Sequence, residues 1–425
     1  MTTLREILND DVFKQVFKIS DEEAKKSFIE LLTLYEGFEE VHPNSNVAEK
    51  LNSEFESVQD FNQKVLQKIY QKIRPKKLDN AGLVERKDMQ NPSDLINKIS
   101  QFDLAVMLEK LGVFEERKPP ILQNNVRIIL NGATQLGCQQ RIDSVKNFID
   151  QGLIPQTAVI DLATGNRDLW PDGIGGNDSS NYQPDQMLTT LLAEKTAKSA
   201  TEITQIIFDE RAKLVGLTIS TLSPDQKSDL RSNIIENLKS EFVKSNAEFV
   251  WPQESEMFFR LTRKNFSQMK VVTHGGAADQ NQGRATGITG LRKVALDLIE
   301  EVKNGELNGD VNLAVIAGDG HALRFSAILS DEIAQAAKAE NISVANKFSF
   351  YPAGPSFSKN SFVIAQNNSL QNVAQNLLNL IESSLGVINH EMTRRVEIKR
   401  EEPSASMQTS TAQQVQKSSD QNLNR

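Results

Sequence analysis

The sequence predicts an α/β fold, a Rossmann-like three-layer sandwich with a mainly parallel sheet. An apolar run at 126–130 enters a turn of small residues, Asn131-Gly132-Ala133-Thr134, and a helical pattern follows that turn. Further short apolar runs come later in the chain, and helical patterns separate most of them. Strands that alternate with helices are typical of a parallel sheet that is covered on both faces by right-handed crossovers.

Five apolar runs have the length and composition of buried strands. They span residues 126–131, 157–162, 269–273, 311–317 and 342–350. Apolar residues recur every three or four positions at 288–302 and 325–337, which predicts a helix on each side of the fourth strand.

The regions outside these strands predict three further parts of the chain. Residues 1–120 show helical periodicity and end at a stiff Pro119-Pro120 joint, so we expect an α-helical N-terminal region. Residues 121–390 then form the α/β domain, with a helical insertion at about 172–268 and a last helix at about 370–385. The polar stretch 391–425 has too few apolar groups to offset its ordering entropy, and we expect it to be disordered.

Composition narrows the class of protein. The 425 residues include 48 basic and 56 acidic side chains, so an acidic, mixed surface is expected, without the basic footprint of a nucleic-acid-binding protein. No apolar run is long enough to span a bilayer. A single cysteine, Cys138, excludes a disulfide within the chain, and we expect it to be a buried packing residue. The N-terminal residues are charged and do not resemble a secretory signal, so a cytoplasmic location is expected; export without such a signal stays open.

The turn after the first strand is the first candidate ligand site. Backbone N–H groups near Asn131 and Gly132 would approach a ligand closely, and the following helix would add the positive end of its dipole. Arg141 lies further along that helix, where it would clamp a phosphate or a carboxylate. The alternative is a structural turn with Arg141 at the surface.

The second and third strands end in similar small and polar groups. Thr164-Gly165 follows the second strand and would form another wall of the same pocket. His274-Gly275-Gly276 follows the third strand in an expected flexible loop, where His274 would act as an acid or base. The alternative for His274 is a polar turn residue.

The fourth strand leads into Asp319, His321 and Arg324. His321 and Arg324 are three positions apart, so one helical face would turn both toward an anion. Asp319 would contact the same ligand, or would instead cap the helix. Asp319 and His321 are too few for a metal site, and no metal is expected. Nucleophile-elbow, Walker-type and Gly-x-Gly-x-x-Gly motifs are absent, so the sequence names no cofactor and leaves open whether the protein is an enzyme.

The order of these strand-end motifs resembles the YdcF/SanA/ElyC-like domain family, whose members are largely of unknown function. The resemblance covers about residues 124–355, and the family's acidic, Ser/Thr and Asn residues after the third strand are replaced here by His274-Gly275-Gly276. It implies a Rossmann-like domain with a pocket for a polar ligand, either nucleotide-like, S-adenosylmethionine included, or a cell-envelope precursor. The residues that match the family's motifs are Arg141, Gly152, Thr164, Gly165, Glu256, His321 and Arg324.

Two functions follow as hypotheses. In the first, the domain binds a small anionic or nucleotide-like ligand at the carboxyl ends of the strands and, as an enzyme, transforms it with His274 and His321 as the catalytic residues. In the second, the α/β domain is a scaffold, and the helical regions bind a protein partner in a non-catalytic interaction or effector protein. Convergence of the four strand ends on one polar pocket would favour the first hypothesis.

Overall fold

The computed structural model describes a large part of the chain. The described residues are 1–8, 21–34, 45–69, 103–133, 135–165, 169, 186–196, 198–212, 224–239, 251–276, 287–318, 321–344 and 347–356. They fall into two compact units, one formed by residues 1–115 and 356–425 and the other by residues 116–355. The helix expected at 370–385 and the polar stretch 391–425 lie outside the described residues.

The N-terminal unit is mainly helical where it is described, and a two-stranded antiparallel sheet accompanies its helices. Phe55 lies in β2 within this expected helical region, and the next helix begins only at Val58, where Ser57 accepts a hydrogen bond from the backbone N–H of Asp60 as the cap. The elements are β1 (Thr2–Thr3), α1 (Leu4–Ile7), α3 (Glu22–Leu32), α5 (Val47–Leu51), β2 (Glu54–Phe55), α6 (Val58–Phe61), the π-helix η1 (Asn62–Leu66) and α9 (Leu104–Lys110).

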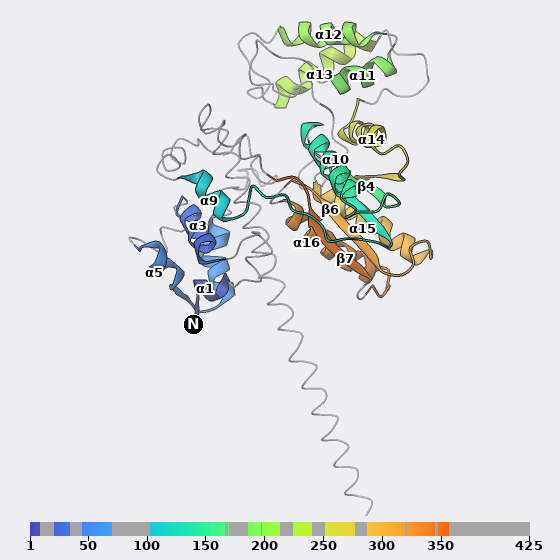
Figure 1. The fold of residues 1–425 in the computed structure, drawn as a ribbon. Coiled ribbons are helices and arrows are strands. Elements are labelled where there is room, and N and C mark those ends of the chain that lie inside the picture. Colours follow the sequence, from blue (N-terminus) through green and yellow to red (C-terminus); the bar gives the residue numbers. More distant parts are fainter. Residues whose placement is uncertain are drawn as a thin grey trace, which may run out of the picture. The chain divides into compact units, whose positions relative to one another are not determined.

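A five-stranded, all-parallel sheet forms the centre of the second unit and confirms the predicted fold class (Figure 1). Its strands are β3 (Val126–Asn131), β4 (Val159–Gly165), β5 (Val271–Gly276), β6 (Val311–Ile316) and β7 (Phe348–Ala353). Their order in the sheet is β5-β4-β3-β6-β7. The chain builds outward from β3 on one side and then returns to add β6 on the other, so the sheet has a topological switch point between β3 and β6.

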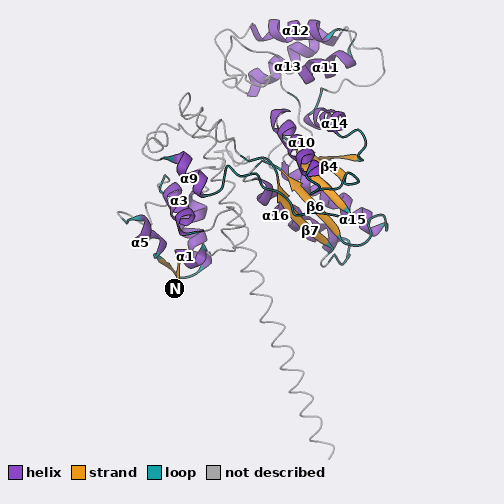
Figure 2. Ribbon diagram, in the orientation of Figure 1, coloured by secondary structure: helices purple, strands orange, loops and turns teal. Residues whose placement is uncertain are grey.

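Helices cover both faces of this sheet (Figure 2). Ile128 and Leu130 point to a core shared with α10 (Gln135–Asp150) and α14 (Glu254–Asn265), whereas Ile129 points to a core shared with α15 (Gly287–Lys303) and α16 (His321–Ala339). Successive side chains of a strand point to opposite faces, so the apolar run of β3 supplies both cores.

Helices α11 (Gln186–Lys195), α12 (Ala200–Ala212) and α13 (Pro224–Lys239) contact one another in sequence order and form the helical insertion that the sequence predicts. Helix α14 also falls in the range 172–268 but packs against β4, β5 and α10. It therefore serves as the crossover helix between β4 and β5. None of the helices in the described ranges combines the length and the apolar composition that crossing a bilayer requires.

Three strands extend beyond their expected ends: β4 to Gly165, β5 to Gly276 and β7 to Ala353. Strand β7 also begins at Phe348, later than the expected start at 342. Thr164 pairs with Gly275 and Gly165 pairs with Gly276, so the expected flexible loop after the third strand is a continuation of β5. A Cβ atom built on Gly276 would lie 2.5 Å from the carbonyl carbon of Thr289 in the first turn of α15. Glycine is needed at this point because the helix and the strand approach each other backbone to backbone.

Replacing Gly276 with Ala is therefore expected to lower the free energy of unfolding by about 1–3 kcal/mol, because the strand or α15 must shift to admit the methyl group. Urea denaturation measures the effect. Gly318→Ala is the matched control, since apart from its chain neighbours no described residue comes within 4 Å of a Cβ built there; its change is expected to stay within about 0.5 kcal/mol. Equal stability of Gly276→Ala and the wild type would contradict this account of the packing.

Candidate functional site

The carboxyl ends of four strands lie along one edge of the sheet. Asn131 at the end of β3 pairs with Ala163 of β4, and Thr164 pairs with Gly275 of β5. On the other side of β3, Leu130 pairs with Ile316, the last residue of β6. The parallel register thus brings to one edge the ends of the strands that carry the predicted ligand-binding residues Asn131, Gly132, Thr164, Gly165, Gly275 and Gly276.

Arg141 of α10 is fixed to the first of these strand ends. Its Nη1 donates hydrogen bonds to the carbonyl oxygens of Asn131 and Gly132, the second over 2.8 Å. The residue is only 8% exposed, and no carboxylate of the described residues pairs with it. Burial lowers the pKa of Arg141 from its ordinary value. A cation without a counterion in the described part of the chain therefore lies at the carboxyl end of β3.

Two buried side chains at this edge lack hydrogen-bond partners among the described residues. They are Asn131, at both its amide nitrogen and its amide oxygen, and Thr164 at its hydroxyl oxygen. Both residues are 0% exposed. Each unsatisfied buried polar group costs about 1–3 kcal/mol. Gly132 lies beside Thr164, since a Cβ built on Gly132 would be 3.4 Å from the Thr164 methyl carbon.

His274 lies in a row of buried and half-buried charges on the α15 side of the sheet. Its Nε2 is 2.8 Å from an oxygen of Asp161 on β4, and its Nδ1 is 2.7 Å from an oxygen of Asp297 on α15. Asp161 also accepts two hydrogen bonds of 2.7 Å from Arg127 on β3. Arg127 donates a further bond of 2.7 Å to Glu301 of α15.

This geometry requires the charged form of His274. Ionised carboxylates only accept hydrogen bonds, so both ring nitrogens must carry a proton to satisfy Asp161 and Asp297. Burial alone would lower the pKa of His274, but the hydrogen bonds and charges of the two carboxylates outweigh it and raise the pKa above its ordinary value. Both ring nitrogens are thus engaged, and the ring is 2% exposed, an arrangement that favours a structural role. The catalytic role of His274 stays a prediction.

Arg127 and Asp161, the central ion pair of this row, are not among the predicted site residues. The signal was present, because each charge interrupts an otherwise apolar strand. A charged residue in such a strand requires a partner, since burying an unpaired charge is costly. Asp161 is 0% exposed, and its contacts to Arg127 and His274 outweigh the effect of burial and lower its pKa.

His321 and Arg324 open helix α16, which follows β6 at the same edge. The His321 ring stacks on Phe325, with 5.7 Å between ring centroids. The backbone N–H of His321 donates to the carbonyl oxygen of Gly318 over 2.9 Å. His321 and Arg324 are both half-buried, and Asp319 lies outside the described residues.

Glu256 is engaged elsewhere on α14. Its carboxylate pairs with Lys195 of α11 over 3.2 Å and with Arg260 of α14 over 3.5 Å. Arg260 also pairs with Glu194 of α11 over 2.6 Å. These ion pairs join the insertion to the crossover helix, and a ligand-binding role for Glu256 stays a prediction.

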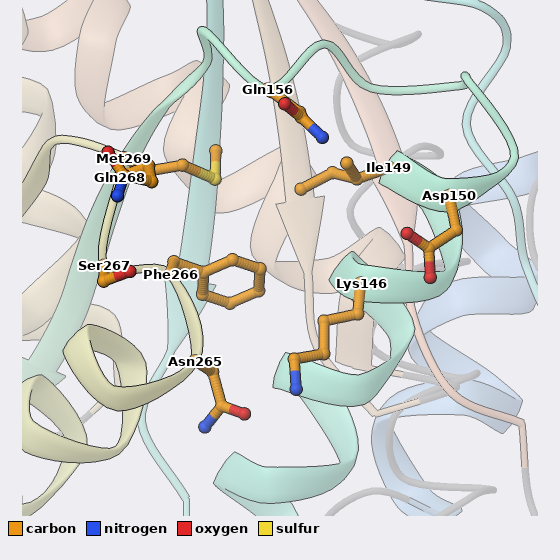
Figure 3. A pocket seen from close by; sticks show the side chains of 9 residues that line it. All are labelled: Lys146, Ile149, Asp150, Gln156, Asn265, Phe266, Ser267, Gln268 and Met269. Atoms are coloured by element: carbon orange, nitrogen blue, oxygen red, sulfur yellow. The ribbon is translucent and has the colours of Figure 1, made fainter.

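A hollow of about 420 Å³ lies at the opposite, amino edge of the sheet (Figure 3). It is bordered by the last turn of α10, by the segment before β4 and by the segment that joins α14 to β5. Its lining residues are Lys146, Ile149, Asp150, Gln156, Asn265, Phe266, Ser267, Gln268 and Met269. None of the residues predicted for the ligand site lines this hollow.

A reactive cysteine and a metal site are two further chemistries that the described residues could carry. Cys138 is buried, and burial raises the pKa of its thiol to about 12, which disfavours a reactive thiolate. Among the residues that the structure describes, no group of three or more His, Cys, Asp or Glu side chains is placed to hold a metal ion.

Comparisons with known proteins identify no relative of this chain. No protein-family model matches the chain, no curated protein is significantly similar to it, and no solved structure matches it. The resemblance to the YdcF/SanA/ElyC-like family therefore stays a prediction that rests on the order of the strand-end motifs.

The charge row predicts a pH dependence of stability. Because the pKa of His274 is raised on folding, its stabilising contribution is present below the ordinary histidine value of about 6.5 and is lost as the pH rises through the raised pKa. We expect the free energy of unfolding to fall by about 1–3 kcal/mol over this range, since deprotonation leaves one carboxylate facing a nitrogen lone pair. Urea denaturation from about pH 6, near the ordinary histidine pKa, to about pH 10 measures this dependence.

His274→Gln removes the titrating group and should flatten this part of the profile. Arg292→Ala is the control on α15, because it removes the ion pair of Arg292 with Glu332, in which the Arg292 side chain is 55% exposed, and leaves the side chain of His274 in place; it should keep the wild-type dependence. A His274→Gln profile that parallels the wild type would show that His274 is not the group responsible.

Proposed function

We propose that the α/β domain binds a small anionic or nucleotide-like ligand at the carboxyl edge of its sheet, next to the switch point between β3 and β6. The observation that carries the proposal is the buried guanidinium of Arg141, whose described hydrogen bonds go only to two backbone carbonyl oxygens. A ligand anion would supply the counterion that the described residues do not. Open α/β sheets generally hold ligands outside the carboxyl ends of strands at such a point.

Helix termini support the same choice of ligand. Helix α10 begins three residues after Gly132, and α16 begins three residues after Gly318. The N-terminus of a helix carries a partial positive charge and unpaired N–H groups, which favour phosphate and carboxylate. Arg324, in the first turn of α16, would add a full positive charge on that side of the switch point.

Chemistry on the bound ligand would need a proton donor or acceptor at the same edge. His274 is held between two carboxylates on the α15 side, so His321 is the stronger candidate of the two predicted catalytic histidines. The interaction-protein alternative also remains a prediction. Large exposed apolar side chains among the described residues include Val106, Ile121, Phe259 and Leu296, which lie on four separate segments.

Thermal unfolding with candidate ligands tests the proposal. AMP, S-adenosylmethionine, a sugar phosphate and inorganic phosphate are added to the wild type, and at least one is expected to raise its melting temperature. A ligand at 100 times its dissociation constant stabilises by about 2.7 kcal/mol. Arg324→Ala should abolish this shift and leave the circular dichroism spectrum unchanged, because Arg324 would contact the ligand from outside the sheet core.

Arg141→Lys is a second variant, which keeps the positive charge but loses the paired hydrogen bonds to the turn; it should weaken the ligand-induced shift. Lys303→Ala is the control, because Lys303 pairs with Glu340 on the surface, with both side chains about half exposed. Identical shifts in the wild type, Arg324→Ala and Arg141→Lys would refute the assignment of the site.

A further inference from the structure

The Asn131 amide is a buried group with no assigned partner. Both of its polar atoms lack a hydrogen bond within the described part of the chain, although the residue is 0% exposed. Leaving a donor and an acceptor unsatisfied lowers stability, and an apolar side chain of the same shape would avoid that cost. A polar residue that breaks this local rule is most often found at a functional site.

Strand alternation places Asn131 on the face that α15 and α16 cover. Arg127 and Ile129 precede it on the same face of β3; Arg127 binds Glu301 of α15, and Ile129 packs in the core of α15 and α16. Asn131 is the last residue of β3, so its side chain lies at the carboxyl edge of this face.

The amino-terminal parts of α15 and α16 meet at this place, where Gly287 begins α15 and Phe325 lies one turn into α16. A Cβ built on Gly287 would lie 3.2 Å from the Phe325 ring, and one built on Gly290 would lie 2.9 Å from the carbonyl carbon of Ala163. Ala163 is the residue of β4 that pairs with Asn131. The unpartnered amide thus faces the N-termini of two long helices, where the dipoles favour an anion.

An anion alone would not satisfy this amide. A phosphate dianion only accepts hydrogen bonds, so it would bind the amide nitrogen and leave the amide oxygen without a donor. A nucleobase edge or an amide offers a donor beside an acceptor, and a carboxamide side chain binds such a pair through two hydrogen bonds.

Resting on the proposed function above, we infer that Asn131 is a specificity residue, and that the ligand joins an anionic group to a neutral group with a hydrogen-bond donor beside an acceptor, as a nucleoside phosphate does. Arg141 and Arg324 would neutralise the anionic group. Asn131 would select the neutral group and so distinguish a nucleotide from free phosphate.

The test compares the dissociation constants of AMP and inorganic phosphate, measured by calorimetry on the full chain, for the wild type and two variants. Asn131→Leu keeps the shape of the side chain but removes its donor and acceptor, and Asn131→Asp keeps only acceptors. In both variants the preference for AMP over phosphate should fall by about tenfold or more, because a site built to bind a polar group discriminates strongly. Asn147→Ala, an exposed position on α10, is the control and should keep the wild-type preference.

The outcomes separate the two proposals. Without ligand, Asn131→Leu should melt at or above the wild-type temperature, since the amide has no partner to lose; a clear decrease would show that the amide is structural and would overturn the inference. A wild-type AMP preference in both variants, with binding still lost in Arg324→Ala, would overturn the inference and leave the proposed function standing. If the wild type binds neither AMP nor phosphate, the proposed function fails for these probes and the inference fails with it.

Discussion

A row of charges, buried at its centre, joins three strands of the sheet to one helix and links the strands that end at the carboxyl edge. Arg127, Asp161 and His274 come from β3, β4 and β5, while Asp297 and Glu301 come from α15. Lys293 of α15 also pairs with Asp297, which gives the row three cations and three anions. Arg127, Asp161 and His274 are the buried members, and removing one of them leaves an uncompensated buried charge. The row therefore fixes the register of the strands whose ends carry the candidate site.

The two buried arginines of β3 and α10 differ in whether a carboxylate compensates their charge. Arg127 forms ion pairs with the carboxylates of Asp161 and Glu301, so its charge is compensated within the fold. Arg141 is bound only by the backbone carbonyl oxygens of Asn131 and Gly132 among the described residues, so its charge remains uncompensated. The same residue type thus stabilises the middle of the sheet in one place and prepares an anion site at the edge in the other.

The sequence predicts the sheet well because strand formation depends on local apolar runs, and all five runs overlap observed strands. The sequence also predicts the common edge, because the carboxyl ends of parallel strands lie at the same edge of a sheet. The environment of each polar residue was less predictable, because it depends on pairing across strands. His274 has the residue type of an acid or base, yet Asp161 and Asp297, distant in sequence, occupy both of its nitrogens. Glu256 is likewise engaged by Lys195, a residue of the insertion.

The polar groups at the two ends of β3 differ in a way that points to function. Arg127, near the start of the strand, meets Asp161 and Glu301, so burying its charge is fully compensated. The side-chain amide of Asn131, at the end of the strand, meets no donor or acceptor in the described structure, although a leucine of similar shape would remove the penalty. Proteins are held near a stability threshold, so a costly residue persists where an activity needs it. Single atoms of Asn62, Arg117, Glu210 and Thr262 are also buried without a hydrogen bond elsewhere in the described structure. The carboxyl edge differs because the whole Asn131 amide, the Thr164 hydroxyl and the Arg141 guanidinium are uncompensated there together, and this favours a binding site over a sheet that serves only as a scaffold.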